Sequence, residues 1–304
     1  MSRNSTAILD NGAMAAKLPA TQDPQQLQGD SPTQRDSTAQ ADSVQSEQWR
    51  ALNVGLQALG RVARTVGQTA KELAKALDPD LLRHATQLPL MGLVQLGPSR
   101  APIVPLPDDG ARPVLFLHGL GGHRSNFAPM RAWFRLHGRS RTYSLGLDTK
   151  GTVEQMAAEL QNVIAEVLAC NRLPEGAQVD IVAHSMGGIV ARLALQDPQT
   201  AARVAQVVTL GTPHAGTQAA RFARTPHVRE LRPNSPVMQA LAVQVPWPQH
   251  LPPLTAFWSP SDLLLLPALT GAMEGARNVE MTGFTHYSYL LDLRSAREVW
   301  NVLT

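Results

Sequence analysis

Residues 179–188 read Val179-Asp180-Ile181-Val182-Ala183-His184-Ser185-Met186-Gly187-Gly188. The apolar run at the start predicts a buried strand, and the glycines after Ser185 predict a tight turn into a helix. A serine on such a turn is held out as a nucleophile, and the residues two before and two after it must be small so that strand and helix can approach. Gly187 meets this demand, and Ala183 departs from the usual glycine by one methyl group. The stretch therefore predicts Ser185 as a nucleophile.

A second stretch predicts the loop that would stabilise the oxyanion formed when a serine attacks a carbonyl. It is an apolar strand that runs into a glycine-rich loop, Pro113-Val114-Leu115-Phe116-Leu117-His118-Gly119-Leu120-Gly121-Gly122. Such a loop can present a backbone amide to a developing oxyanion, together with the amide of the residue after the nucleophile. We therefore expect the backbone N–H groups of Leu120 and Met186 to form an oxyanion hole. The alternative is a phosphate-binding loop, but the lysine of a P-loop and the full dinucleotide fingerprint are absent.

The chain from Pro113 to Leu291 resembles the α/β-hydrolases and, among them, the bacterial triacylglycerol lipases. The small lidless Bacillus lipases are the nearest match, and one segment is similar to larger lipases. Five separated motifs carry the likeness in the same order: the HG-x-GG loop at 118–122, the elbow at 179–188, Thr212-Pro213-His214-Ala215-Gly216-Thr217, Ser259-Pro260-Ser261-Asp262 and Gly275-Ala276-Arg277-Asn278-Val279. The resemblance implies an α/β-hydrolase fold with a mostly parallel central sheet flanked by helices. It also implies a serine carboxylester hydrolase.

The acid of a catalytic triad should follow the serine and precede the histidine in this fold. Asp262 meets that order and comes just after the apolar run 254–258, at an expected strand end. Asp292 comes too late in the chain, and Glu274 and Glu280 have the pattern of solvated surface charges. Asp262 is therefore the predicted acid.

The predicted base is His286, in a loop after the strand expected around Val279–Thr282. His214 is the main rival, but it precedes Asp262 in the chain. His118 and His184 stand at strand ends beside the expected loops, where we expect them to support the turns by hydrogen bonding.

These motifs do not determine the substrate. A lipid or other acyl ester is the leading hypothesis, with the acyltransferases, thioesterases, phospholipases and polyester depolymerases of the same fold as alternatives. Another class is a non-catalytic interaction protein that uses its N-terminal helix. No cofactor and no metal are expected, because the proposed steps need neither and no Cys/His cluster has zinc spacing.

Composition fits a globular enzyme: 304 residues, 43% hydrophobic, with a net charge of +3 and one cysteine. Basic residues are scattered without interleaved aromatics, which argues against nucleic-acid binding. Weak contact with a membrane or lipid interface stays open. The first residues lack a signal sequence and no apolar run is long enough to span a membrane, so a cytoplasmic location is expected, with signal-independent export left open.

The chain divides into three expected parts. Residues 1–46 are polar and predict a disordered tail, residues 47–109 a helical extension and lead-in, and residues 110–304 the catalytic domain. Within the extension, apolar residues recur in steps of three and four over 52–77 and predict a helix with a heptad seam. The seam could pack on the hydrolase body, form a dimer, or lie on a membrane or over the active site.

One long connection, 212–253, interrupts the catalytic domain. It is rich in proline and apolar residues, and a connection of this length in a compact domain is usually functional. We expect a cap or lid that forms part of an acyl-binding groove. The alternative is an extra helix that only packs on the domain.

Overall fold

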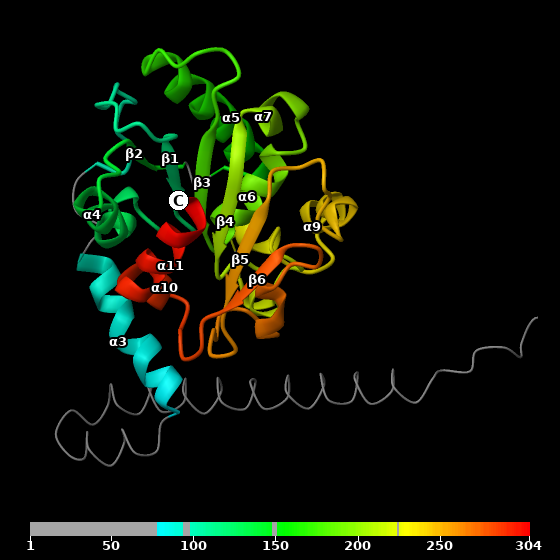
Figure 1. The fold of residues 1–304 in the computed structure, drawn as a ribbon. Helices are drawn as coiled ribbons and strands as arrows, with labels where there is room; N and C mark the ends of the chain where they lie inside the picture. Colours follow the sequence, from blue (N-terminus) through cyan, green and yellow to red (C-terminus); the bar gives the residue numbers. More distant parts are fainter. Residues whose placement is uncertain (1–77, 94–97, 148–150, 224) are drawn as a thin grey trace, which may run out of the picture. The chain divides into compact units, whose positions relative to one another are not determined.

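The computed structural model describes residues 78–93, 98–147, 151–223 and 225–304. Within these ranges, strands and helices alternate along the chain (Figure 1). The elements are, in order, α3 (Pro79–Leu93), β1 (Val114–Leu117), η1 (Arg124–Phe127), α4 (Ala128–Leu136), β2 (Thr142–Leu145), α5 (Val153–Cys170), β3 (Val179–His184), α6 (Met186–Ala194), α7 (Pro198–Ala202), β4 (Val204–Leu210), η2 (Gln218–Phe222), α8 (Pro226–Arg229), α9 (Pro236–Leu241), η3 (Ala242–Gln244), β5 (Leu254–Trp258), η4 (Ala268–Gly271), β6 (Arg277–Glu280), α10 (Ser288–Leu291) and α11 (Leu293–Leu303).

The described strands form one sheet in the order β2-β1-β3-β4-β5-β6, and every neighbouring pair is parallel. The expected parallel α/β architecture is confirmed. Because all strands run the same way, the loops that follow them gather at one edge of the sheet. The candidate site residues follow β1, β3, β5 and β6 and therefore share that edge.

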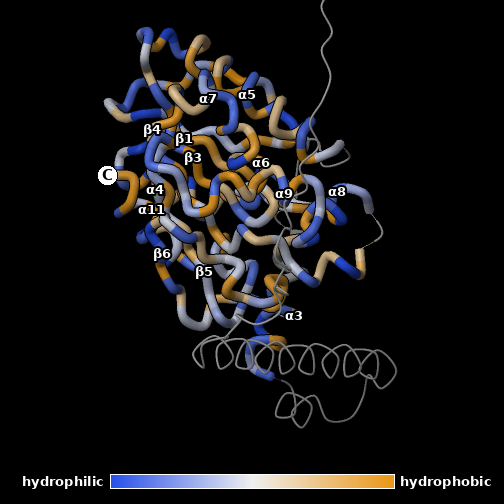
Figure 2. Tube along the Cα trace, turned by 90° about the vertical axis from the view of Figure 1, so that its right-hand side faces the viewer, coloured by the Kyte–Doolittle hydropathy of each residue, from blue (hydrophilic) through white to orange (hydrophobic). Residues whose placement is uncertain are grey.

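Both faces of the sheet are covered by helices, which explains why its strands are apolar almost throughout. In β1, Leu115 and Leu117 face a buried cluster shared with α5 and α6, whereas Val114 and Phe116 face a second cluster shared with α4 and α11. This alternation is what successive side chains on a strand require. Figure 2 shows hydrophobic residues concentrated around β1, β3 and α6, in the middle of the view.

Several local predictions can be compared with the structure. Helix α5 begins after Thr152, whose side chain forms a reciprocal capping box with Gln155. The strand expected around Val279–Thr282 was misplaced: β6 begins and ends two residues earlier. Its register is set by pairing with β5, which aligns Thr255 with Arg277, and the exposed edge strand has too little apolar pattern to mark its ends.

The N-terminal third is described only in part. The predicted tail at 1–46 and the heptad seam at 52–77 lie outside the described residues. Helix α3, which includes Pro89 in its interior, was not predicted. Residues 98–109 form neither helix nor strand. Among the helices of the described ranges, none is long and apolar enough to cross a membrane.

The connection 212–253 is held to α6 by a buried arginine. The guanidinium of Arg192 donates to the carbonyl oxygens of His214 and Leu241 and to the side-chain oxygen of Gln244, at 2.7, 2.9 and 3.2 Å. Arg192 is fully buried, and burial lowers its pKa to about 10, so it stays charged near neutrality. The connection is therefore fixed to the helix that follows Ser185.

A buried ion pair secures the opposite edge of the sheet. Asp180 of β3 accepts from Arg112 at 2.9 Å and from Arg139 at 2.8 Å, and its side chain is fully buried. Arg139 also donates to the carbonyl oxygens of Arg112 and Leu303. Through these two arginines the carboxylate joins the start of β3 to the segments that precede β1 and β2 and to the C-terminal helix α11.

We expect Asp180→Ala to lower the free energy of unfolding by about 3–5 kcal/mol, because it leaves a buried arginine without its partner. Urea unfolding followed by circular dichroism measures this change. Glu298→Ala is the matched control, since its partner Arg297 is largely exposed and the pair should contribute at most about 1 kcal/mol. Equal effects of the two substitutions would contradict this account of the pair.

Buried His214 predicts a pH dependence of stability. Burial, and secondarily the charge of Arg192, hold its pKa well below the usual value. In the unfolded chain this imidazole binds a proton near pH 6.5, whereas in the native protein it stays neutral. The free energy of unfolding therefore falls by up to about 1.4 kcal/mol per pH unit as the pH drops below about 6.5. In His214→Gln, urea unfolding between pH 8 and 5 should show a smaller fall of the free energy of unfolding with pH than in the wild-type protein. An unchanged slope would show that His214 does not contribute.

Candidate active site

Ser185, His286 and Asp262 form one continuous line of hydrogen bonds. The His286 Nε2 atom lies 2.9 Å from Ser185 Oγ, and its Nδ1 atom lies 2.9 Å from Oδ2 and 3.1 Å from Oδ1 of Asp262. The Asp262 side chain is fully buried and that of His286 is 5% exposed. The three residues predicted from the sequence are therefore brought together, from segments up to 101 residues apart.

Ser185 sits at a tight junction between β3 and α6. Its backbone has φ 54° and ψ −126°, a conformation that residues with a side chain rarely adopt. Gly187 faces the end of β1 so closely that an added Cβ would lie 2.7 Å from the His118 carbonyl oxygen. The predicted need for a small residue at 187 thus has a direct steric cause.

The glycine-rich loop after β1 packs against the serine. A Cβ on Gly119 would lie 2.7 Å from the Cβ of Ser185 and 3.2 Å from its Oγ. The loop closes as a turn through a bond from the Gly122 amide to the Gly119 carbonyl, with Gly121 at φ 60°. Leu120 lies at the tip of this turn and Met186 is the first residue of α6. In the described part of the chain, neither of their amides donates a hydrogen bond to another group.

Asp262 is held in place by the loop that follows β5. Its Oδ1 atom accepts from the Leu264 amide at 3.1 Å, and its own amide and carbonyl bond within the same turn. A Cβ on Gly211 would lie 2.9 Å from Oδ2, so the end of β4 also approaches the carboxylate closely. The acid is therefore fixed in the orientation in which it accepts from His286.

His184 supports the loop that carries His286. Its Nε2 atom donates to the His286 carbonyl oxygen at 2.8 Å, and the two ring centroids are 4.7 Å apart. Burial, then the neighbouring His286, hold the pKa of His184 well below its usual value. His184 is consequently neutral and adds no positive charge next to His286. This is the turn-supporting role expected for it.

The rival residues lie elsewhere or have other partners. His214 is buried, and its Nε2 atom is 3.0 Å from the Thr209 hydroxyl. Asp292 caps α11 and pairs with Arg294. Glu274 and Glu280 are exposed.

A cavity of about 210 Å³ opens beside Ser185 and His286. Leu120 lines it from the glycine-rich loop, and Tyr287 lines it from the loop that carries His286. The connection 212–253 contributes Pro213, Thr217, Ala219, Ala220, Val228 and Leu231, and the segment after Asp262 contributes Leu264 and Leu265. The cavity is thus largely apolar, and residues distant in sequence enclose it.

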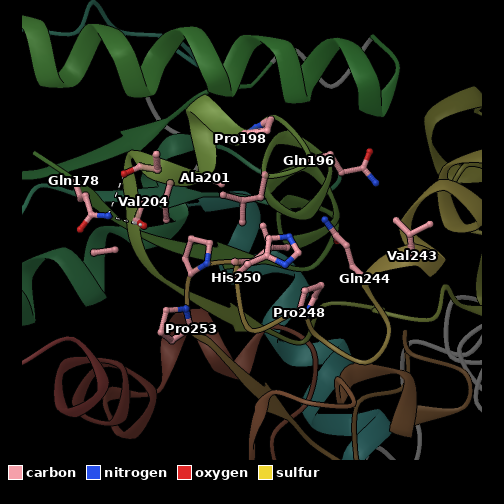
Figure 3. A pocket seen from close by; sticks show the side chains of 15 residues that line it. Gln178, Gln196, Pro198, Ala201, Val204, Val243, Gln244, Pro248, His250 and Pro253 are labelled. Atoms are coloured by element: carbon pink, nitrogen blue, oxygen red, sulfur yellow. Dashed lines mark hydrogen bonds between the residues drawn. The ribbon is translucent and has the colours of Figure 1, made fainter. Parts of the chain in front are cut away.

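A larger cavity, of about 770 Å³, lies at the other edge of the sheet (Figure 3). Gln178, Val204 and Pro253, at or before the starts of β3, β4 and β5, line it together with Val243 and His250. None of the candidate site residues borders it. The larger cavity is therefore not the candidate site, and the small cavity is chosen because Ser185 and His286 line it.

The sequence did not predict the cavity-lining residues of α8 and of the loop after Asp262, nor Tyr287. It also did not predict the contacts of α3 with the His286 loop. Isolated apolar residues in loops carry no periodic signal. Among the described residues, no group of three or more His, Cys, Asp or Glu side chains is arranged to hold a metal ion.

Comparison with known proteins finds matches over parts of the chain. A family model described as a PGAP1-like alpha/beta domain matches residues 147–228, which include Ser185 but neither Asp262 nor His286. Among curated proteins, a "GPI inositol-deacylase" of Cryptococcus neoformans is 46% identical over 67 residues, which are 21% of this chain and 9% of that protein. A "Triacylglycerol lipase" of Burkholderia plantarii is 30% identical over 152 residues, 44% of this chain and 39% of that one. The chain thus matches less than two fifths of the length of either relative.

Among solved structures, the mature form of Bacillus licheniformis lipase BlEst2 superimposes with a TM-score of 0.53 at 20% identity. The superposition covers 67% of this chain and 96% of that one. The parallel sheet and this superposition show that the chain has the α/β-hydrolase fold, and parts of its sequence are similar to a lipase and to an inositol-deacylase.

Proposed function

We propose that the protein is a serine carboxylester hydrolase that cleaves acyl esters through an acyl-enzyme intermediate. The observation that carries the proposal is the line of hydrogen bonds from Ser185 through His286 to Asp262. In this mechanism His286 Nε2 takes the proton of Ser185 as Oγ attacks the ester carbonyl, then gives it to the leaving alcohol. Asp262 keeps the proton on Nδ1 and stabilises the imidazolium. Water then releases the acyl group by the same steps.

The backbone amides of Leu120 and Met186 are the proposed oxyanion hole. Met186 begins α6, where the first amides of a helix have no intrahelical partner and point out from its positive end. Leu120 lines the cavity that also contains Ser185. One amide from each loop would then donate to the oxygen on which negative charge develops. Loss of one such donor typically raises the barrier by about 3–4 kcal/mol.

The apolar cavity supports an acyl group as the part of the substrate that is bound. Its volume of about 210 Å³ is below the range of roughly 300–1,000 Å³ typical of sites that enclose a drug-sized ligand. It suits one acyl chain of medium length better than a whole lipid. In this proposal the connection 212–253 is the cap that forms one wall of the acyl pocket.

A second candidate concerns the alcohol side of the ester. The match to a PGAP1-like domain and to an inositol-deacylase favours an acyl group esterified to inositol. Both candidates use the same proposed serine chemistry. Comparison of fatty acid release from acyl-inositol and from monoacylglycerol discriminates between them.

The reaction is tested with p-nitrophenyl esters of two, eight and sixteen carbons. We expect turnover by the wild-type protein to be fastest with eight carbons, and Ser185→Ala to lower it by about 10⁴-fold or more, because the nucleophile is lost. Asp262→Asn should have a similar effect, of about 10⁴-fold, since the imidazole is left in the wrong tautomer.

Ser261→Ala is a control one residue from Asp262, and it should keep wild-type turnover. Folded wild-type protein that releases no p-nitrophenol from any of the three esters would contradict the proposed hydrolase. If an added alcohol is consumed faster than water, the acyltransferase alternative is favoured.

The acyl pocket is tested by Val228→Trp, which fills the cavity from the side of α8. The ratio of eight-carbon to two-carbon turnover should fall about tenfold, because a small acetyl group still fits. Val243→Trp places the same ring at the larger, distant cavity, where Val243 is 78% exposed, and should leave the ratio unchanged. Equal losses with both esters would show that this cavity does not hold the acyl chain.

A further inference from the structure

Helix α3 precedes the sheet in the chain and packs against the loop that carries His286. We propose that Gln87 of α3 is a positioning residue, which holds the His286 imidazole in line between Ser185 and Asp262. This inference rests on the proposed function for its catalytic consequence. Its structural part, the fixing of the imidazole, can be measured without a substrate.

The side-chain amide of Gln87 bridges the two residues that flank the turn at His286. Its Oε1 atom accepts from the Thr285 hydroxyl at 2.6 Å, and its Nε2 atom donates to the Ser288 hydroxyl at 3.1 Å. Thr285 is fully buried and Ser288 is 3% exposed. The two hydroxyls are also 3.1 Å from each other, so the three side chains form a closed polar cluster. Thr285 and Ser288 are buried and Gln87 is half-buried, so few other partners are available to the two hydroxyls.

Other residues of α3 anchor the helix on this loop. The Arg83 guanidinium donates to the Gly283 carbonyl oxygen, and the His84 ring lies 5.3 Å from the ring of Tyr287. Met91, further along α3, joins the buried cluster of α4 and α11. Positions 83, 84, 87 and 91 fall on one side of a helix, since three- and four-residue steps bring side chains together. Helix α3 therefore presents Gln87 to the loop from a fixed position.

The loop is held from two directions. On the side of the sheet, His184 donates to the His286 carbonyl oxygen. That bond fixes one backbone atom, whereas Gln87 fixes the side chains of Thr285 and Ser288, which lie one residue before and two residues after His286. A displacement of about 1 Å in a reacting group can reduce a rate by about 100-fold, so the second restraint is expected to matter.

The test is Gln87→Leu, which keeps the size of the side chain and removes both hydrogen bonds. With p-nitrophenyl octanoate we expect kcat to fall about tenfold or more, while KM changes less than about twofold, because Gln87 does not line the acyl cavity. The downfield proton NMR signal of His286 Nδ1–H, bound to Asp262, should broaden or disappear. Asp262→Asn assigns that signal.

Thr86→Val is the matched control on α3, because the Thr86 hydroxyl bonds only to the Arg83 carbonyl within the helix. It should keep both kcat and the NMR signal. Gln87→Glu retains an acceptor for Thr285 and should recover most of the lost kcat. A merely structural role of Gln87 would instead lower stability without separating kcat from KM.

Thr285→Val approaches the same contact from the loop and serves if Gln87→Leu does not fold. Its loss of kcat should be no larger than that of Gln87→Leu, and the double variant should be no worse than Gln87→Leu, because Gln87→Leu already breaks the bond to Thr285. Unchanged kcat and an unchanged Nδ1–H signal in these variants would overturn the proposal, and so would additive losses.

The two proposals can fail separately. If the wild-type protein cleaves no ester, the hydrolase proposal fails, but the Nδ1–H signal still reports whether Gln87 positions the imidazole. If the ester is cleaved and the signal is insensitive to Gln87, only the positioning inference fails.

Discussion

The close approach of three backbones at Ser185 is the constraint on which the site depends. The serine adopts φ 54° where β3 turns into α6, the glycine-rich loop packs against its Cβ, and the start of α6 packs against the end of β1. A side chain at Gly119 or Gly187 would collide with neighbouring backbone or with the serine itself. This crowding brings the serine oxygen and the amides of Leu120 and Met186 to one edge of the sheet.

The parallel sheet separates the edge that carries the candidate site from the edge that carries the buried ion pairs. Ser185, Asp262 and His286 follow the carboxyl ends of β3, β5 and β6, whereas the ion pairs of Asp180 lie at the start of β3. At the edge of the candidate site, His184 orients the His286 loop through its bond to the His286 carbonyl oxygen. Substitutions at the two edges should therefore affect different properties, catalysis at one and stability at the other.

Sequence patterns predicted much of this arrangement and missed what depends on tertiary contacts. The elbow, the parallel class and the helix at 153–170 follow from apolar periodicity, glycine placement and a capping box, which are local signals. The ends of β6 depend on pairing with β5, and the cavity wall at Val228 depends on how the 212–253 connection folds back. Helix α3 contains Pro89 in its interior, which argues against a helix in a sequence, and its contact with the His286 loop joins residues about 200 positions apart.

The central claim is that Ser185 is the group that receives the acyl chain. The most direct measurement is to react the full chain with an alkyl fluorophosphonate and to locate the adduct by peptide mass spectrometry. The account predicts one adduct, on the peptide that contains Ser185, and a strong loss of labelling in His286→Ala, because the histidine activates the serine. An adduct on another residue, or labelling that does not depend on His286, would contradict it.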